Sequence, residues 1–430
     1  MLQAALADGT GHRRCVFELF PRRLPEGRRY GVVAGVGRAL DAIENFRFNE
    51  PQVEFLRSAG IVDDTTTDWL GNFEFSGDIW GYPEGETYFG YSPLVIVEGS
   101  FAEAVVLETV LLSIYNHDAA IASAASRMTW AAGDRPCIEM GSRRTHEEAA
   151  VACARAAYVA GFATTSNLAA HQRYGIPSAG TSAHSFTLLH DSEDDAFRSQ
   201  ISSLGSGTTL LVDTFDIATA VETGVELAGP QLGAVRIDSG DLGGLAHEVR
   251  AQLDSLGAKK TKIIVTSDLD EWAIAGLASA PVDAYGVGTR LVTGSGRPTC
   301  GFVYKLVAHE NSAGEMIAVA KQSENKVSIG GRKYALRRLS PAGVAEAEVV
   351  GIGRPARNPS TRSQSSVLKT SDRSLLVPLV TRGEIVGREP LSAARDRHQR
   401  SRAELPRQAR QLQPGEQVIP TIHEPGDQAR

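Results

Sequence analysis

Between residues 133 and 299 the sequence repeats one scheme, in which a β-branched apolar run ends in polar or glycine residues and a helical pattern usually follows. The runs cover residues 138–140, 208–214, 233–241, 261–268 and 282–289. Strands that alternate with helices pair in parallel through right-handed crossovers. So many units in succession favour a barrel over an open sheet, with the polar strand ends gathered at one mouth. We therefore predict an α/β fold in which 133–299 form an irregular (β/α) barrel of parallel strands that carries the active site.

The segments on either side of this region have a different pattern of apolar residues, with short strands that do not alternate with helices. Short strands are expected near 14–20, within 77–97 and again near 301–307, 316–321, 333–339 and 375–380, while an apolar pattern over 101–132 predicts one long connecting helix. The early segment 1–100 and the late segment 300–392 can then pair into a second α+β domain. A polar loop is expected over 358–372, and over 393–430 a polar tail that can contain a short helix.

Charge and cysteine usage exclude several classes of protein. The net charge is −7 with a sequence pI near 5.9, and no compact basic patch indicates a nucleic acid or membrane partner. The four cysteines are far apart and form no C-x-x-C pair, which fits unpaired thiols in a reducing compartment. No apolar run is long enough to span a membrane. We expect a cytoplasmic protein.

The stretch 175–186 places His184 among small and hydroxyl residues. Gly180 and Ala183 leave room for a ligand, and Thr181 and Ser185 offer hydroxyl partners. Imidazole exchanges protons or acts as a nucleophile near neutral pH, so His184 is the candidate for the chemistry. A hydrogen-bonded structural histidine is the alternative.

Two later strand ends carry groups suited to an anionic sugar. Arg236 can bind a phosphate or carboxylate, Asp238 can bind ribose hydroxyls or magnesium, and Gly240 allows a close backbone approach. Gly288 and Thr289 end a Gly-x-Gly-Thr run whose backbone N–H groups can bind a phosphate, although such glycines can also merely form a turn.

The polar residues at other strand ends allow more than one interpretation. Arg143, with Arg144 beside it, can bind a ligand or belong to a surface turn. Asp213 can orient His184 or cap a helix, and Asp268 can hold a ligand or metal or act as a cap. Taken together, these groups indicate an enzyme that acts on a phosphorylated sugar.

In this order, the motifs resemble the nicotinate phosphoribosyltransferase family over nearly the whole chain. The family joins nicotinate to phosphoribosyl pyrophosphate with magnesium, giving nicotinate mononucleotide and pyrophosphate for NAD salvage, and couples this to ATP hydrolysis through a phosphohistidine. The motifs include Phe17-Glu-Leu-Phe, Gly77-Asp-Ile-Trp, Gly141-Ser-Arg-Arg-Thr-His, Thr165-Ser-Asn, Gly180-Thr-Ser-Ala-His-Ser-Phe, Leu211-Val-Asp-Thr, Arg236-Ile-Asp-Ser-Gly-Asp, Gly286-Val-Gly-Thr and Tyr304-Lys-Leu-Val.

The resemblance implies a role for each matching residue. His184 would be phosphorylated, with Asp213 as its orienting acid. Nicotinate or the reacting end of the sugar donor would meet Arg236 and Thr181, with Arg143 over the ring. The residues implied for phosphoribosyl pyrophosphate are Asp238, Gly240, Asp268, Gly288 and Thr289.

The resemblance also implies the choice of base and the assembly. In similar nicotinamide enzymes an aspartate stands at the position of Ser166, and a carboxylate there would repel the nicotinate anion. The expected cofactors are Mg²⁺ and ATP as a co-substrate, and the expected partner is a second copy of the chain that shares the active sites. Met1 aligns with the end of a Thr-Asp-x-Tyr segment that opens the family pattern, so we expect an upstream start.

Other functions remain open at this point. The chain could act on nicotinamide or quinolinate, or be a catalytically silent module that binds a sugar phosphate or dimerises. A phosphosugar aldolase or isomerase is possible on fold alone, but no lysine stands at these strand ends to form a Schiff base.

Overall fold

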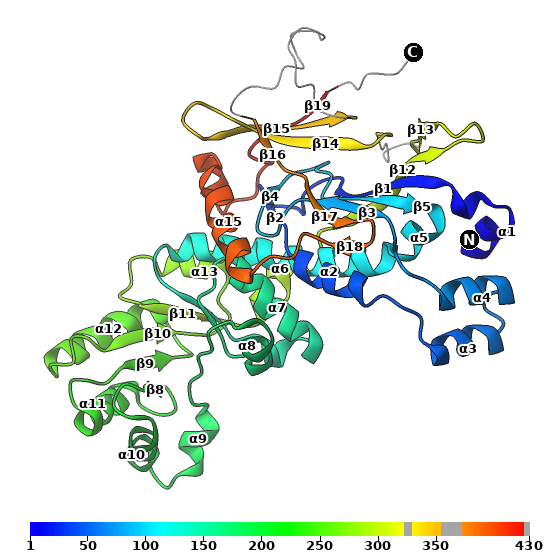
Figure 1. Ribbon diagram of the computed structural model, residues 1–430. Helices are drawn as coiled ribbons and strands as arrows, with labels where there is room; N and C mark the ends of the chain where they lie inside the picture. The colour runs from blue at the N-terminus through cyan, green and yellow to red at the C-terminus, as the bar shows by residue number, and fades with distance from the viewer. Residues whose placement is uncertain (322–328, 354–371, 425–430) are drawn as a thin grey trace. The chain divides into compact units, whose positions relative to one another are not determined.

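The computed structural model describes residues 1–321, 329–353 and 372–424 (Figure 1). The chain divides into two compact units, which are described separately. Unit 1 is drawn from Met1–Ala120 and Thr299–Arg430, and unit 2 is Ile121–Pro298. Within the described ranges, no helix combines the length and the apolar character needed to cross a bilayer.

The boundary between the units falls inside a helix. The segment expected as one helix over 101–132 forms two, α5 (Phe101–Val106) and α6 (Glu108–Ala132). α5 begins with a capping box, in which the Ser100 and Glu103 side chains each accept a hydrogen bond from the other residue's backbone N–H. Leu111 and Tyr115 in the first half of α6 are buried in the core of unit 1, so unit 2 begins within this helix, at Ile121 rather than at residue 133.

Unit 2 contains the predicted parallel sheet. Its six strands lie in the order β7-β6-β11-β10-β9-β8 and curl into a half-barrel. Every neighbouring pair is parallel, as the alternation of strands and helices predicts. The carboxyl ends of all six therefore meet at one edge. The strands are β6 (Cys137–Glu139), β7 (Thr164–Thr165), β8 (Thr209–Leu211), β9 (Ala234–Ile237), β10 (Lys262–Val265) and β11 (Ala284–Val287).

Helices follow these strands, and aspartates begin several of them. Asp216, Asp241 and Asp270 each accept backbone N–H groups at the start of α11, α12 and α13. The helices and 3-10 turns of unit 2 are η2 (Ser142–Arg144), α7 (Glu147–Val159), α8 (Leu168–Tyr174), α9 (His184–Leu189), α10 (Glu193–Leu204), α11 (Ile217–Ala228), α12 (Leu242–Ser255), α13 (Glu271–Gly276), α14 (Thr289–Val292) and η3 (Gly294–Gly296).

Unit 1 is built from both ends of the chain, as predicted. In its seven-stranded antiparallel sheet, β1 lies between the early strand β5 and the late strand β12 (Figure 1). The order is β13 (Met316–Ala318), β12 (Phe302–Glu310), β1 (Arg14–Pro21), β5 (Val95–Ser100), β3 (Asp78–Gly81), β17 (Val377–Thr381) and β18 (Glu384–Ile385).

Two smaller sheets and several helices complete unit 1. A four-stranded sheet has the order β16 (Arg373–Ser374), β14 (Lys333–Leu339), β15 (Ala345–Ile352) and β19 (Thr421–Glu424), and β2 (Gly31–Val32) pairs with β4 (Thr87–Tyr88). The helices and 3-10 turns are α1 (Leu2–Ala7), η1 (Thr10–His12), α2 (Val36–Glu44), α3 (Glu50–Ser58), α4 (Asp64–Gly71), α15 (Leu391–Ala403) and η5 (Arg407–Arg410).

The polar tail expected over 393–430 contains the possible short helix and also a strand that was not expected. α15 buries Ala394, His398 and Ser401, and β19 pairs in parallel with β15. A helix with few buried side chains has a weak apolar pattern, which hides its packing in the sequence. The polar loop expected over 358–372 lies outside the described residues, apart from Asp372.

We predict that the buried His398 makes unit 1 sensitive to acid. Burial, followed by the nearby Arg402 charge, lowers the pKa of His398 from 6.5 to about 3. The unfolded chain therefore takes up this proton below about 6.5, while the folded chain stays neutral. Stability from this group is lost as the pH falls, at about 1.4 kcal/mol per unit. Denaturant unfolding between pH 4 and 7 is expected to show a shallower acid slope in His398→Leu, and parallel curves for the two proteins would contradict this.

Candidate active site

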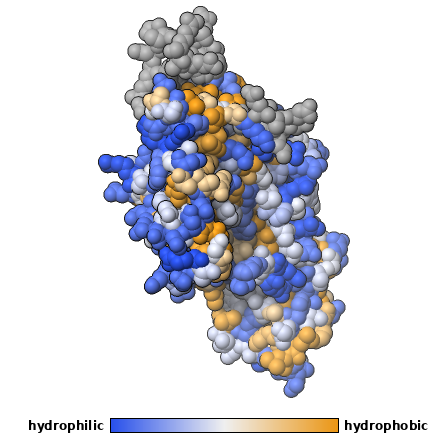
Figure 2. All heavy atoms as spheres, turned by 90° about the vertical axis from the view of Figure 1, so that its right-hand side faces the viewer, coloured by the Kyte–Doolittle hydropathy of each residue, from blue (hydrophilic) through white to orange (hydrophobic). Residues whose placement is uncertain are grey.

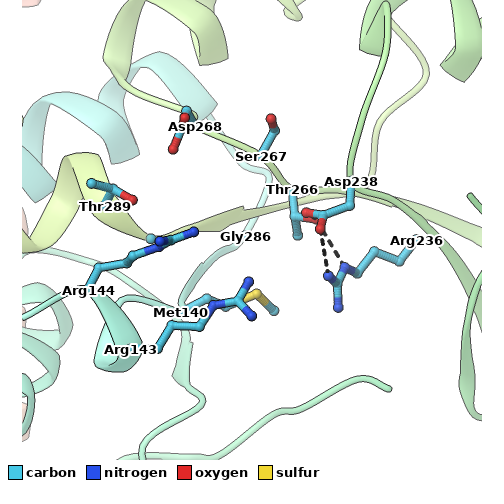
Figure 3. Close-up of a pocket in the computed structure, with 11 residues that line it drawn as sticks. Met140, Arg143, Arg144, Arg236, Asp238, Thr266, Ser267, Asp268, Gly286 and Thr289 are labelled. Carbon is cyan, nitrogen blue, oxygen red and sulfur yellow. Dashed lines mark hydrogen bonds and ion pairs between the residues drawn. The ribbon is translucent and has the colours of Figure 1, made fainter. Parts of the chain in front are cut away.

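A polar cavity of about 220 Å³ lies at the carboxyl edge of the parallel sheet in unit 2 (Figure 3). Residues at the ends of four strands, β6, β9, β10 and β11, line it. The structure thus brings together most of the residues predicted to bind substrates. The lining is Met140, Arg143, Arg144, Arg236, Asp238, Thr266, Ser267, Asp268, Gly286, Gly288 and Thr289.

Arg143 and Arg144 belong to η2, the short turn that follows β6. Figure 3 shows both side chains extending from this turn at the cavity. In the part of the chain that the structure describes, neither guanidinium makes a hydrogen bond or an ion pair. Because a guanidinium binds carboxylates and phosphates through paired hydrogen bonds, two unengaged guanidiniums in one cavity indicate an anionic ligand.

Arg236 of β9 is buried, only 8% exposed, and is held from several sides. Its Nε donates a hydrogen bond to the Thr266 hydroxyl at 3.0 Å. Its Nη1 donates to the Thr181 hydroxyl and, at 3.2 Å, to the carbonyl of Ser182. Its Nη2 forms an ion pair with Asp238 at 3.2 Å. The guanidinium therefore has a fixed direction before any ligand binds.

Asp238 is the acidic partner of this arginine. Although partial burial opposes ionisation, a hydrogen bond from the Thr266 hydroxyl and the charge of Arg236 together lower the pKa of Asp238 below its usual value. The carboxyl group is therefore ionised at neutral pH. One hydroxyl, that of Thr266, thus bridges the two charged groups at the floor of the cavity.

We predict that Thr266→Val lowers kcat/KM for the reaction of this site by about tenfold, because the buried Arg236 Nε loses its acceptor and the carboxylate loses a donor. Valine matches threonine in volume, but the unpaired Nε also costs stability, so the assays are run well below the melting temperature of each variant. Thr266→Ser keeps the hydroxyl and is the matched control. Steady-state kinetics of the three proteins test this, and equal losses in both variants would contradict it.

His184 begins α9 and has a side chain that is 40% exposed. Its Nδ1 lies 3.2 Å from the hydroxyl of Thr214. Its Nε2 lies 3.8 Å from Asp213 Oδ1 and 3.9 Å from Asp238 Oδ2, which are ion-pair distances rather than hydrogen bonds. His184 is therefore next to the cavity, through Asp238, and faces two carboxylates instead of one.

Asp213, the predicted orienting acid, has a side chain that is only 2% exposed. Its Oδ2 accepts hydrogen bonds from the backbone N–H of Asp238 and from the Ser239 hydroxyl, both at 2.8 Å. Its Oδ1, the atom nearest His184, is buried without a hydrogen-bond partner among the described residues. Asp216 rather than Asp213 caps the following helix, which leaves Asp213 facing His184.

Three other predicted residues are not among those that line the cavity. The Thr181 hydroxyl accepts a hydrogen bond from Arg236 and so helps to position the arginine. Ser166 is exposed at the end of β7 and is not among the residues that line the cavity. Gly240 has a φ of 88°, and a Cβ there would lie 2.9 Å from Leu245, so the turn itself requires glycine.

Sequence reasoning missed several residues of this site. The pattern places Thr266 and Ser267 at the end of a strand, although Ser267 lines the cavity with a φ of 129°, in a region that favours glycine. Glu139 was read as part of an apolar run. A signal was available for each of them, because a hydroxyl or an acid that directly ends a parallel strand lies at the functional edge of the sheet.

Comparison with known protein families gives two matches. Residues 1–116 match the model described as the nicotinate phosphoribosyltransferase (NAPRTase) N-terminal domain, and residues 136–335 match the nicotinate phosphoribosyltransferase (NAPRTase) family.

Individual relatives agree with these matches. The chain is 54% identical to nicotinate phosphoribosyltransferase pncB1 of Mycobacterium tuberculosis, over 98% of this chain and 92% of that protein. It is 37% identical to the nicotinate phosphoribosyltransferase of Bacillus subtilis, over 79% of this chain and 71% of that protein. The crystal structure of human nicotinic acid phosphoribosyltransferase covers 99% of this chain and 96% of its own, with a TM-score of 0.83 and 23% identity, which supports the fold.

Proposed function

The chain belongs to the nicotinate phosphoribosyltransferase family, and we propose that it joins nicotinate to phosphoribosyl pyrophosphate, giving nicotinate mononucleotide and pyrophosphate for NAD salvage. The observation that carries this is the cavity in unit 2, where Arg143 and Arg144 are unengaged beside the fixed Arg236–Asp238 pair. Every ligand of the reaction is an anion, which suits such a cavity.

The proposed chemistry needs position and charge more than proton transfer. The bond from ribose C1 to the pyrophosphate oxygen breaks, and a bond from C1 to the nicotinate nitrogen forms. Positive charge builds on the ribose as the pyrophosphate leaves, and the ionised Asp238 offers it a carboxylate. Arg143 and Arg144 offer the anionic groups paired hydrogen bonds, which hold the reactants in place.

We propose that Mg²⁺ binds together with the phosphorylated substrates. Among the described residues, no group of three or more His, Cys, Asp or Glu side chains could hold a metal ion. The cavity does contain the carboxylates of Asp238 and Asp268. Mg²⁺ is commonly bound by one or two carboxylates together with substrate phosphates, so this donor set fits a metal that neutralises pyrophosphate charge.

We also propose that ATP phosphorylates His184. The carboxylates of Asp213 and Asp238 near Nε2 favour a proton on that nitrogen, which leaves the lone pair on Nδ1. In the transfer, the γ-phosphorus forms a bond to this nitrogen, its bond to the bridging oxygen breaks, and ADP leaves. Water later releases the group as phosphate. On Nδ1 the phosphoryl dianion would lie next to the Thr214 hydroxyl, on the ring atom away from the two carboxylates.

Exposed apolar side chains in unit 2 support a homodimer as part of the proposal. The lower end of the molecule in Figure 2, where Figure 1 places α9 and α10, shows a group of apolar side chains. In this part of the chain Leu188, Leu189 and Leu204 are all more than half exposed. We propose that the two copies share their active sites. We also propose a cytoplasmic location, because the four buried cysteines are free thiols, as in a reducing compartment.

The test is product formation by the purified chain with phosphoribosyl pyrophosphate and Mg²⁺, offered nicotinate or nicotinamide, with and without ATP. We expect nicotinate mononucleotide, formed faster with ATP. Product from nicotinamide alone would overturn the choice of base. Binding of phosphoribosyl pyrophosphate without any turnover would favour a catalytically silent binding module.

The choice of base gives a separate prediction. We expect Ser166→Asp to lower the ratio of kcat/KM for nicotinate to that for nicotinamide by about tenfold or more, because a carboxylate repels the nicotinate anion and accepts from the amide. Ser166→Asn introduces a similar volume without charge and is the control. Competition assays with both bases measure the ratio, and an unchanged ratio in Ser166→Asp would contradict this assignment.

A further inference from the structure

We propose that Glu139 is a positioning residue that fixes the loop carrying Arg143 and Arg144 at the cavity. This acid ends β6, is only 1% exposed and is not among the residues that line the cavity. The identity of the anion rests on the proposed function, whereas the positioning role rests on contacts within unit 2.

The Glu139 carboxylate contacts the loop after β6 and the end of β7 at once. Its Oε1 accepts the backbone N–H of Gly141, and its Oε2 accepts the hydroxyl of Thr165, both at 2.5 Å. Its backbone carbonyl accepts the N–H of Ser166 at 2.8 Å. Gly141 precedes η2, and Thr165 is the last residue of β7, so one buried side chain links the start of the arginine turn to the end of the neighbouring strand, while its backbone holds Ser166.

The contacts of Glu139 continue into a closed circuit. The Thr165 hydroxyl also accepts the backbone N–H of Asn167 at 2.9 Å. The Asn167 amide donates to the Ser142 hydroxyl at 3.0 Å. Ser142 is the residue before Arg143. This chain of hydrogen bonds therefore leads back to η2, and the arginine turn is held at two consecutive residues, Gly141 and Ser142.

The far side of the turn has no free space. A Cβ on Gly141 would lie 2.2 Å from a methyl of Val292 in α14 and 3.2 Å from the carbonyl of Gly288. Gly288 and Met140 both line the cavity. The start of the turn is thus closely packed against Glu139, Val292 and the Gly288 carbonyl, which limits where the two guanidiniums can lie.

A buried carboxyl without a cation is a costly way to hold a loop. Within the described ranges Glu139 has no ion pair, and its burial raises its pKa, although hydrogen bonds from Thr165 and Gly141 oppose the rise. An apolar side chain of similar size would avoid this cost. The acid instead provides two acceptor atoms, one for the arginine turn and one for the end of β7, which is a gain in geometry rather than in stability.

The test uses two pairs of variants and one probe. Inorganic pyrophosphate with Mg²⁺ is titrated into the full chain by calorimetry, and product formation is measured in parallel. We expect Thr165→Val to bind pyrophosphate about tenfold more weakly and Glu139→Ala on the order of 100-fold more weakly. Thr165→Ser and Glu139→Gln, which keep hydrogen-bonding groups at these positions, should recover most of the affinity.

A double-mutant cycle separates positioning from general damage. If Glu139 acts through the arginine turn, Thr165→Val should cost little more once Arg143→Ala is present. Additive losses, or full affinity in Thr165→Val, would overturn the inference. So would a wild type that binds no pyrophosphate, because the arginines would then form no anion site. A wild type that binds pyrophosphate but makes no product would refute the proposed function while leaving this test intact.

Discussion

Arg236→Lys is expected to lower kcat/KM for nicotinate mononucleotide formation by about 100- to 1,000-fold, although the positive charge is kept. The guanidinium of Arg236 contacts Thr266, Thr181 and Asp238 through separate nitrogens. An ammonium is a single point of charge and cannot span these directions at once. The lysine variant would therefore leave at least one buried partner without its hydrogen bond and release the loop that holds Thr181.

The control for this prediction is an arginine outside the cavity that also has several partners. Arg250 of α12 forms an ion pair with Asp254 at 2.8 Å and donates to the carbonyls of Thr261 and Ala258. Arg250→Lys disturbs the same unit to a similar degree, but kinetics should stay within about threefold of the wild type. Steady-state kinetics and melting curves of both variants make the comparison. Equal kinetic losses would mean that Arg236 acts through stability alone.

The parallel sheet could be predicted because its signal is local and repeated. Residues 234–237, 262–265 and 284–287 are apolar runs that end in polar or glycine residues, and each lies where the pattern places a strand. Strand direction then follows from the intervening helices, and parallel direction alone gathers the carboxyl ends. The meeting of Arg143, Asp238 and Thr289 is a consequence of this topology.

The partners of the site residues could not be predicted in the same way. Asp213 and Asp216 are three residues apart in one loop, yet the first faces His184 and the second caps α11. An aspartate suits both roles, and which role it takes depends on the direction of its side chain, which cannot be inferred from sequence spacing. Thr266 was hidden for a related reason, because a threonine is as common inside a strand as at a site.

His184→Ala is expected to abolish the ATP-dependent part of the reaction. If Nδ1 of His184 accepts the γ-phosphoryl group, its loss removes the nucleophile, and labelling of the protein by ATP should fall to background. The rate with ATP should then equal the rate without ATP. Phosphoryl labelling followed by acid and alkali treatment identifies a phosphohistidine, since its bond to phosphorus is lost in acid and survives in alkali.

The same helix supplies the control for this last prediction. His190 directly follows α9, and its ring Nδ1 lies 2.8 Å from the carbonyl of Phe186. His190→Ala changes the local packing but touches neither Asp213 nor Asp238, so ATP should still accelerate that variant. Asp213→Asn keeps the shape and removes one of the charges that favour a proton on His184 Nε2, so its labelling by ATP should slow without disappearing. Unchanged ATP stimulation in His184→Ala would place the phosphoryl acceptor elsewhere and would leave the histidine with a role in binding alone.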